Sequence, residues 1–150
     1  MALGYTTYKT PNAIFTIDQD YTGKEGCGVR LVNQGEVSLA TQAADYPYGI
    51  IVVGGESVDG TYPGLIGGSA IEFVDMVGCV VQVLISFYGT VSAGEFLYID
   101  STDADGSFVT TANVPPAAGD WVWGIALTDA AEGQQCLMRF QPFIVQYIAP

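Results

Sequence analysis

The sequence predicts an all-β protein, a small β-sandwich or β-barrel-like domain with extended N- and C-terminal arms. Short runs of β-branched and aromatic residues recur along the chain, and the 19 glycines and 7 prolines fall largely between them. No long stretch has the 3.6-residue periodicity of an amphipathic helix. Short strands at intervals of roughly 8–12 residues, separated by turn residues, are typical of sandwiches and barrels.

The apolar runs define the expected strands, and the residues between them define the expected turns. We expect strands at 29–32, 37–40, 48–53, 70–74, 80–88, 95–99, 108–111, 121–127, 135–140 and 143–148. Residues 33–35 predict a turn between two strand-like runs. Residues 103–106 predict a hairpin, because Asp-Gly tolerates a positive φ, and residues 131–134 predict another. The glycine-rich stretch 54–68 is expected to be a long loop.

Both ends of the chain are more apolar than free termini usually are. We therefore divide the chain into an N-terminal arm (1–17), a β-rich domain (18–140) and a C-terminal apolar tail (141–150). Two interpretations remain open: each end packs as an edge strand on its own domain, or it reaches across to a neighbouring subunit. The candidate residues for an interface with another chain are Tyr5, Tyr8, Phe15, Phe140, Phe143 and Tyr147.

Charge is scarce and one-sided. Only 13% of the residues are charged, and 16 acidic residues face 4 basic ones, for a net charge of -12. Typical soluble domains carry about 25% charged residues, so a low fraction predicts apolar surface covered by a partner. Binding to nucleic acid or to an anionic membrane depends on basic residues. We therefore expect no nucleic-acid and no membrane partner, and the N-terminal residues do not resemble a targeting signal.

The chemistry of an enzyme is missing from the sequence. The chain has no histidine, which removes Ser-His-Asp and Cys-His activation and the commonest metal ligand. Neither a nucleophile elbow nor a phosphate-binding loop is present, and the glycines at 23–28 have the wrong spacing for a dinucleotide fingerprint. A pair of carboxylates remains the one route to hydrolysis. We expect a protein that is not an enzyme and has no cofactor.

The cysteines and a group of aspartates are the candidate metal ligands in the sequence. Cys27, Cys79 and Cys136 are widely spaced, and we expect them to be buried, reduced thiols. Asp100, Asp103 and Asp105 resemble part of a calcium loop. The first ligand position would be Ser101, however, and the twelfth Ala112, so a turn with solvated aspartates is the better interpretation. No metal site is expected.

The order of segments in the chain resembles a known family. Residues 91–100 (VSAGEFLYID) precede 106–110 (GSFVT) and then 118–134 (AGDWVWGIALTDAAEGQ), and the first half adds 20–31 (DYTGKEGCGVRL) and 48–53 (YGIIVV). This order is similar to that of the small head decoration (cement) proteins of tailed bacteriophages. The resemblance covers residues 18–54 and 91–140, and its specificity lies in the order of the segments, since each one alone is only a hairpin.

The resemblance implies a structural virion protein that is β-rich, binds the outer surface of the phage head as a homotrimer and stabilises the capsid. Its partners would be the major capsid protein and other copies of itself. It would reside on the outer head surface of the virion and in the host cytoplasm before assembly. Two alternatives remain: another viral assembly module, such as a fibre or tail part, or a carbohydrate-binding β-sandwich with Trp121 and Trp123 as a sugar platform. The two tryptophans flank Val122 on one predicted strand, so they fit a core or interface face equally well.

Overall fold

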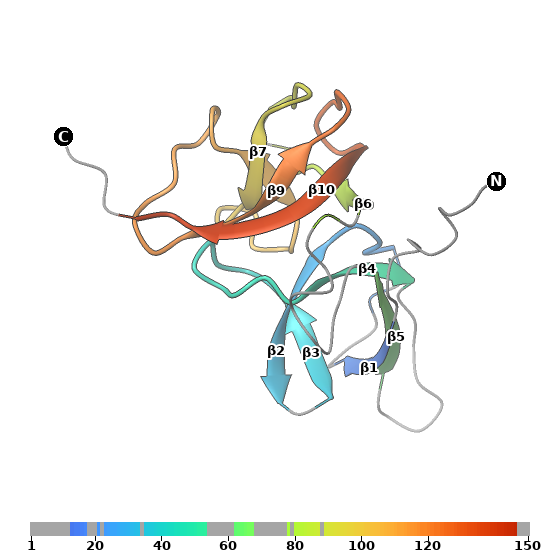
Figure 1. The fold of residues 1–150 in the computed structure, drawn as a ribbon. Helices are drawn as coiled ribbons and strands as arrows, with labels where there is room; N and C mark the ends of the chain where they lie inside the picture. The colour runs from blue at the N-terminus through green and yellow to red at the C-terminus, as the bar shows by residue number, and fades with distance from the viewer. Residues whose placement is uncertain are drawn as a thin grey trace.

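The computed structural model describes residues 13–17, 21, 23–33, 35–53, 62–67, 78, 80–87 and 89–146, with the backbone alone at 13–16, 52–53 and 62–67. This part of the chain forms ten strands and no helix, and therefore contains no helix that could span a membrane. The predicted all-β class is confirmed. Two β units pack together, a small barrel and a five-stranded sheet (Figure 1).

The first unit is a closed barrel in the order β1-β3-β2-β4-β5. The barrel closes because β1 pairs antiparallel with β5 and parallel with β3, while the other neighbours are antiparallel. Its interior is filled by buried side chains that include Ile17, Val29 and Val37. The strands are β1 (Ala13–Ile17), β2 (Gly28–Asn33), β3 (Glu36–Leu39), β4 (Gly49–Val53) and β5 (Tyr62–Gly67).

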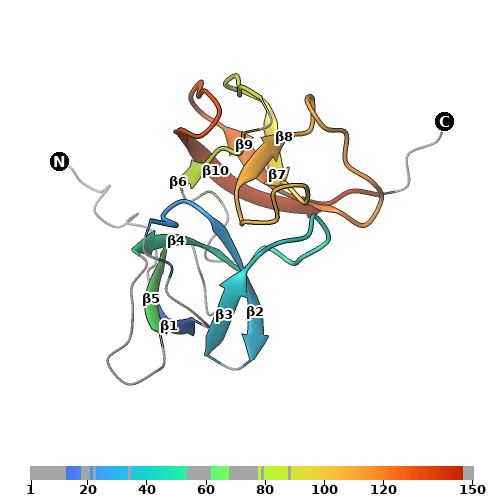
Figure 2. The ribbon, with the colours of Figure 1, turned by 180° about the vertical axis from the view of Figure 1, so that it is seen from behind.

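The second unit is an antiparallel sheet in the order β6-β10-β9-β7-β8. Its two edges approach each other, because Ile85, which follows β6, forms a parallel bridge to Phe108 in β8. The sheet therefore curls around its own core, as the rear view shows (Figure 2). The strands are β6 (Val80–Leu84), β7 (Phe96–Ile99), β8 (Phe108–Thr110), β9 (Trp121–Ala126) and β10 (Gln135–Ile144).

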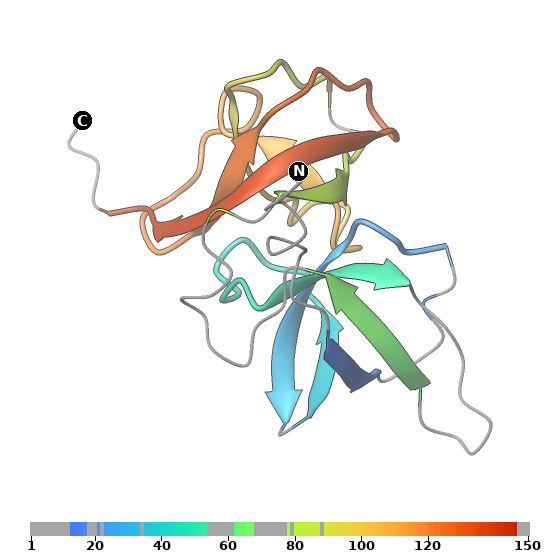
Figure 3. The same cartoon turned by 45° about the vertical axis from the view of Figure 1, so that its right-hand side comes forward.

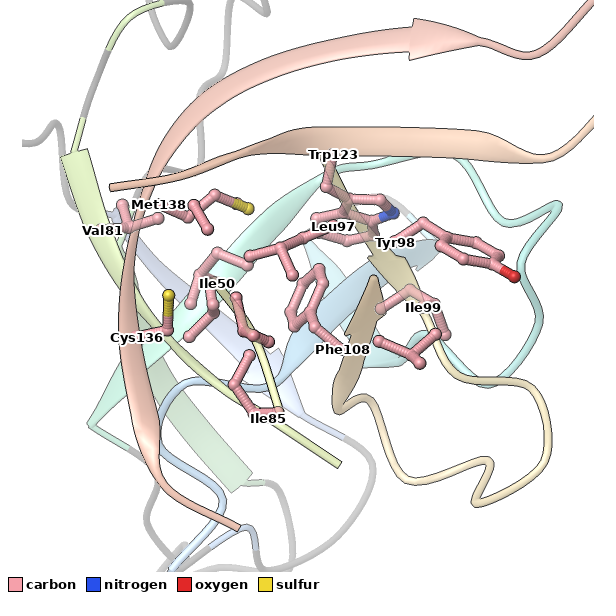
Figure 4. Packing of buried hydrophobic residues seen from close by; sticks show 14 of the residues in the cluster. Ile50, Val81, Ile85, Leu97, Tyr98, Ile99, Phe108, Trp123, Cys136 and Met138 are labelled. Atoms are coloured by element: carbon pink, nitrogen blue, oxygen red, sulfur yellow. The ribbon is translucent and has the colours of Figure 1, made fainter. Parts of the chain in front are cut away.

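Trp123 lies at the centre of the larger core. Its ring is fully buried and meets Phe108 and Phe140 edge to face, with ring centroids 5.2 and 6.2 Å apart. Figure 4 shows Phe108 between Leu97 and Ile99 beneath the tryptophan. Ala40, Ala43 and Ile50 from the first half of the chain belong to the same cluster, so one core joins the two units. Edge-to-face pairs of this kind stabilise beyond their buried area by about 0.5–1.5 kcal/mol each.

The two units meet at residues 26–28, where the chain enters β2 (Figure 3). Gly26 donates its amide to the Ile51 carbonyl (2.9 Å) and accepts from the Leu84 amide (2.8 Å). Gly28 donates to the Gly106 carbonyl in the β7–β8 turn (2.8 Å). A Cβ at Gly26 would lie 2.7 Å from the Leu84 nitrogen, and one at Gly28 would lie 2.8 Å from the Trp123 ring. Only glycine allows the backbone of the two units to approach this closely.

The predicted turn at 33–35 and the two predicted hairpins at 103–106 and 131–134 are confirmed. They join β2 to β3, β7 to β8 and β9 to β10, and Gly35, Gly106 and Gly133 in their turns all have positive φ. The runs 135–140 and 143–148 were expected as two strands, but β10 continues through both as far as Ile144. A register shift between Phe140 and Phe143 absorbs the irregularity. The expected strand at 70–74 lies outside the described residues.

The expectation of one long loop at 54–68 is wrong for Tyr62–Gly67, which form β5. Pro63, Gly64 and Gly67 are poor strand formers, so the local sequence does not predict a strand there. The backbone pairs of this segment come instead from two neighbours, β1 on one side and β4 on the other. Strand β1 itself lies within the segment assigned to the N-terminal arm, and residues 141–144 of the assigned tail continue β10.

Gly28→Ala tests the close approach between the two units. The backbone at Gly28 has no positive φ, so the substitution acts only through the crowding of Trp123 and Ile99 (2.8 and 2.9 Å from the added carbon). We expect a loss of about 2 kcal/mol in the free energy of unfolding, measured by urea denaturation. The matched control is Gly35→Ala, which meets open space and has only its φ of +75° against it. It should cost about 1 kcal/mol, and a Gly28→Ala loss no larger than the control's would contradict the crowding argument.

Candidate interaction surface

The outer face of the second sheet carries a row of side chains across four neighbouring strands. The backbone register places Val80 opposite Arg139, Arg139 opposite Ile125, and Ile125 opposite Phe96. Val80 is 43% exposed and Phe96 40% exposed, Ile125 is half-buried and Arg139 is exposed. Residues on neighbouring strands at one register share a face, so these four form one surface, which we call the outer row.

Phe143 extends the outer row beyond the register shift in β10. It is 43% exposed, and its ring meets that of Phe96 edge to face, with centroids 5.4 Å apart. After the register shift, Phe143 pairs with Val122 in β9. Its ring contacts Phe96 in β7. Two half-exposed aromatic rings therefore lie side by side at one end of the row, an arrangement typical of protein interfaces.

Charge is segregated away from this surface. Arg139 is the only charged residue in the five strands of the second sheet. The acidic residues of this unit lie in its turns and loops, and many of them bond there. Asp120 accepts from the Ala117 amide, Glu95 from the Ser92 amide and Asp129 from the Ala93 amide, at 2.7–2.9 Å. A chain with a net charge of -12 thus presents a sheet face that carries apolar side chains, the neutral glutamines Gln82 and Gln135, and a single charge, that of Arg139.

A second exposed apolar site lies at the end of the β2–β3 hairpin. Leu31 and Val32 are 47% and 42% exposed, although both belong to a strand. Glu36 begins the returning strand, and its Oε1 accepts from Asn33 Nδ2 at 2.8 Å across the turn. We call these residues the hairpin tip. Figures 1 and 2 show the hairpin pointing away from the second sheet, so the tip and the outer row lie on different units of the molecule.

The six candidate interface residues fall in different places. Tyr5, Tyr8 and Tyr147 lie outside the described residues. The backbone of Phe15 pairs with Gly64 inside the barrel, and its side chain is not described. Phe140 is fully buried against Trp123 and so belongs to the chain's own core. Phe143 is exposed on the outer row.

The sequence interpretation missed Phe96, Ile125, Val80 and Arg139. All four lie in predicted strands. In 135–140, Cys136, Met138 and Phe140 are buried. Because side chains alternate along a strand, Arg139 faces outward. What the sequence does not give is the strand order, which brings β6, far away in the chain, next to β10. Without that order, each of the four residues taken singly does not indicate a shared surface.

The acidic turn after β7 is only partly solvated, so the expectation of solvated aspartates is wrong for Asp100. Its side chain is 2% exposed, its Oδ1 accepts from the Thr102 amide (2.9 Å) and its carbonyl accepts from the Ala104 amide (3.1 Å). Asp103 is exposed, and Asp105 accepts from the Ser107 amide and hydroxyl. Asp100 therefore shapes the turn. The described residues contain no cluster of acidic, cysteine or histidine side chains that could hold a metal ion.

The tryptophan pair does not form an open platform. Trp123 is fully buried, and Trp121 is half-buried and packs on the same core. Tyr46 meets Trp121 edge to face at 5.0 Å and is 45% exposed, which leaves one aromatic edge at this surface. Sugar-binding platforms present a ring face to the ligand. The expected alternative that Trp121 and Trp123 belong to a core face is the one that fits their burial.

Comparison of the sequence with protein-family models and with curated protein sequences finds no match. The candidate surface therefore rests on its own geometry.

Cys27 and Cys136 are buried free thiols, as expected, and Cys79 lies outside the described residues. Burial raises the pKa of Cys27 from 9.0 to about 12, and the nearby carboxylate of Asp105 adds to the effect. Burial also raises the pKa of Cys136, against the hydrogen bonds with Thr128 that lower it. The thiolate is the reactive form of cysteine, so both thiols are held in the inert form.

We predict that iodoacetamide at pH 8 leaves Cys27 unmodified in the folded protein and alkylates it fully in guanidinium, as measured by peptide mass spectrometry. The same pKa shift predicts a stability effect. The unfolded chain loses the thiol proton from about pH 9, whereas the folded chain keeps it until about pH 12. Stability should therefore fall as the pH rises through this window. Cys27→Ala is the control that should fall less steeply, and an equal slope would contradict the assignment.

Proposed function

We propose that this chain is a non-enzymatic structural protein that works by assembling with other chains, on the outer head surface of a tailed bacteriophage. In this proposal it forms a homotrimer, binds the major capsid protein and stabilises the capsid. The observation that carries the proposal is the outer row: a sheet face with Phe96 and Phe143 exposed and no acidic residue, on an otherwise acidic protein. Burying such a face against another chain removes apolar area from water, which drives association.

The β segments of the resemblance also support the proposal. Residues 91–100 contain β7, 106–110 contain β8 and 118–134 contain β9 followed by the turn into β10. Hairpins therefore occur where the resemblance to head decoration proteins expects them. The acidic loops would keep the free protein soluble and disfavour contact with packaged nucleic acid.

A fibre or tail module would use the same kind of surface, and the choice between these assembly roles rests on the resemblance. The carbohydrate-binding alternative is less well supported, because Trp123 is in the core and Trp121 packs against it.

Co-sedimentation of the purified protein with expanded, empty phage heads tests the proposal directly. We expect saturable binding to heads that lack the protein and a higher melting temperature of the heads once they are decorated. Light scattering of the free protein should give about three times the 15.8 kDa chain mass. Absence of head binding across heads of the virus that encodes the chain would reject the decoration role.

Truncation of the N-terminal residues gives a second test, and the start of β1 decides how many residues can be removed. Truncation must stop before Ala13, since β1 belongs to the barrel. We predict that deleting residues 1–12, which include Tyr5 and Tyr8, leaves the melting temperature within a few degrees and weakens head binding at least tenfold. Aromatic residues often contribute about 2 kcal/mol or more each at an interface, and three arms would act together. Unchanged head binding with a lowered melting temperature would show that these residues stabilise their own domain instead.

A further inference from the structure

We propose that the hairpin tip of one copy docks on the outer row of the next copy, so that the chain assembles head to tail through two different surfaces. The inference rests on the proposed assembly function and names the contact that would build the oligomer. Its occupant is a second copy of this chain.

The outer row carries a single charge, that of Arg139. A cation buried in an interface needs an anion beside it. The hairpin tip carries a complementary set, with Leu31 and Val32 as exposed apolar side chains and Glu36 paired with Asn33 across the same turn. Asn33 Nδ2 donates to Oε1 of the Glu36 carboxylate. Docking the tip on the row would pair Glu36 with Arg139 while the aliphatic side chains cover the aromatic end.

Like charges disfavour a symmetric contact between two copies of either surface. In a face-to-face dimer whose twofold axis passes near Arg139, two copies of Arg139 would approach each other, and a tip-to-tip dimer with its axis near Glu36 would bring two copies of Glu36 together. Like charges at a desolvated interface cost several kcal/mol. Pairing the tip with the row avoids both repulsions. A contact between two different surfaces is heterologous, and it closes into a ring when the rotation between copies allows. A ring of three is consistent with the proposed trimer.

The hairpin tip lies where a second copy can contact it. The tip lies at the far end of β2, which starts at the junction with the second sheet and runs away from it (Figures 1 and 2). The tip therefore projects from the barrel, where a neighbouring copy can reach it. The bond between Asn33 and Glu36 and the short turn hold the tip in shape before docking, which lowers the entropy lost on association.

A charge exchange tests the contact, measured by sedimentation velocity across micromolar concentrations. Wild-type protein should associate. Glu36→Arg and Arg139→Glu should each weaken association about 100-fold, because each places like charges together. The double variant Glu36→Arg, Arg139→Glu should recover most of the wild-type affinity. The control is Phe87→Ser, which removes the most exposed aromatic side chain of the described residues, at 76%, and lies on neither surface. It should leave association unchanged, and the circular dichroism melt of every variant should match the wild type.

Each other outcome overturns the inference. Loss of association with Arg139→Glu but not with Glu36→Arg would indicate a different occupant on the row. Two weakened single variants without recovery in the double would show that the residues do not meet. A wild-type protein that stays monomeric would exclude a self-contact in solution. The head-binding experiment is separate: heads that fail to bind a normally associating protein would reject the decoration role and leave this contact standing.

Discussion

The fold depends on one close approach, the crossing of residues 26–28 between the barrel and the second sheet. Within three residues the backbone bonds to β4, to β6 and to the β7–β8 turn. A Cβ at either Gly26 or Gly28 would meet neighbouring atoms at under 3 Å, and Gly26 also has a φ of +91°. Because these bonds are buried, they have to be made if the two units are to share a core. The glycines are therefore what allows two small β units, each too small for a sizeable core, to fold as one.

This junction also decides where apolar surface is left exposed. The β7–β8 turn is held by Gly28 and the end of β6 by Gly26, so the curled sheet turns its inner face toward Ala40, Ala43 and Ile50. The opposite face of β6, β10, β9 and β7 has no described element packed across the outer row, and its side chains stay exposed. Hairpin β2–β3 is directed away for the same reason, since β2 starts at Gly28. The two surfaces of the proposed contact are thus consequences of one junction.

The sequence predicts the local structure well and the long-range structure poorly. Hairpins at 33–35, 103–106 and 131–134 could be read from turn residues, because a turn needs only its own few residues. Strand β5 could not, since Pro63 and two glycines are accepted there only by backbone pairing with β1 and β4. The outer row could not be predicted either, because it depends on the order of β6, β10, β9 and β7 in the second sheet. Burial of Phe140 and exposure of Phe143 differ because of the register shift between them, which composition does not reveal.

The charges of the second unit are not spread evenly over its exposed positions. If low charge served only to build a core, the few charges would be spread over all exposed positions, including the outward positions of β6, β7, β9 and β10. Instead the carboxylates of this unit are in turns, where several stabilise backbone amides, and the exposed strand positions hold apolar residues, neutral glutamines and one arginine. An apolar row exposed to water disfavours solubility unless something covers it. The proposed coverage by another chain would account for both the missing carboxylates and the single cation, since Arg139 would favour a partner surface that presents an anion. A face that served only as solvent-exposed sheet would have no such selectivity to maintain.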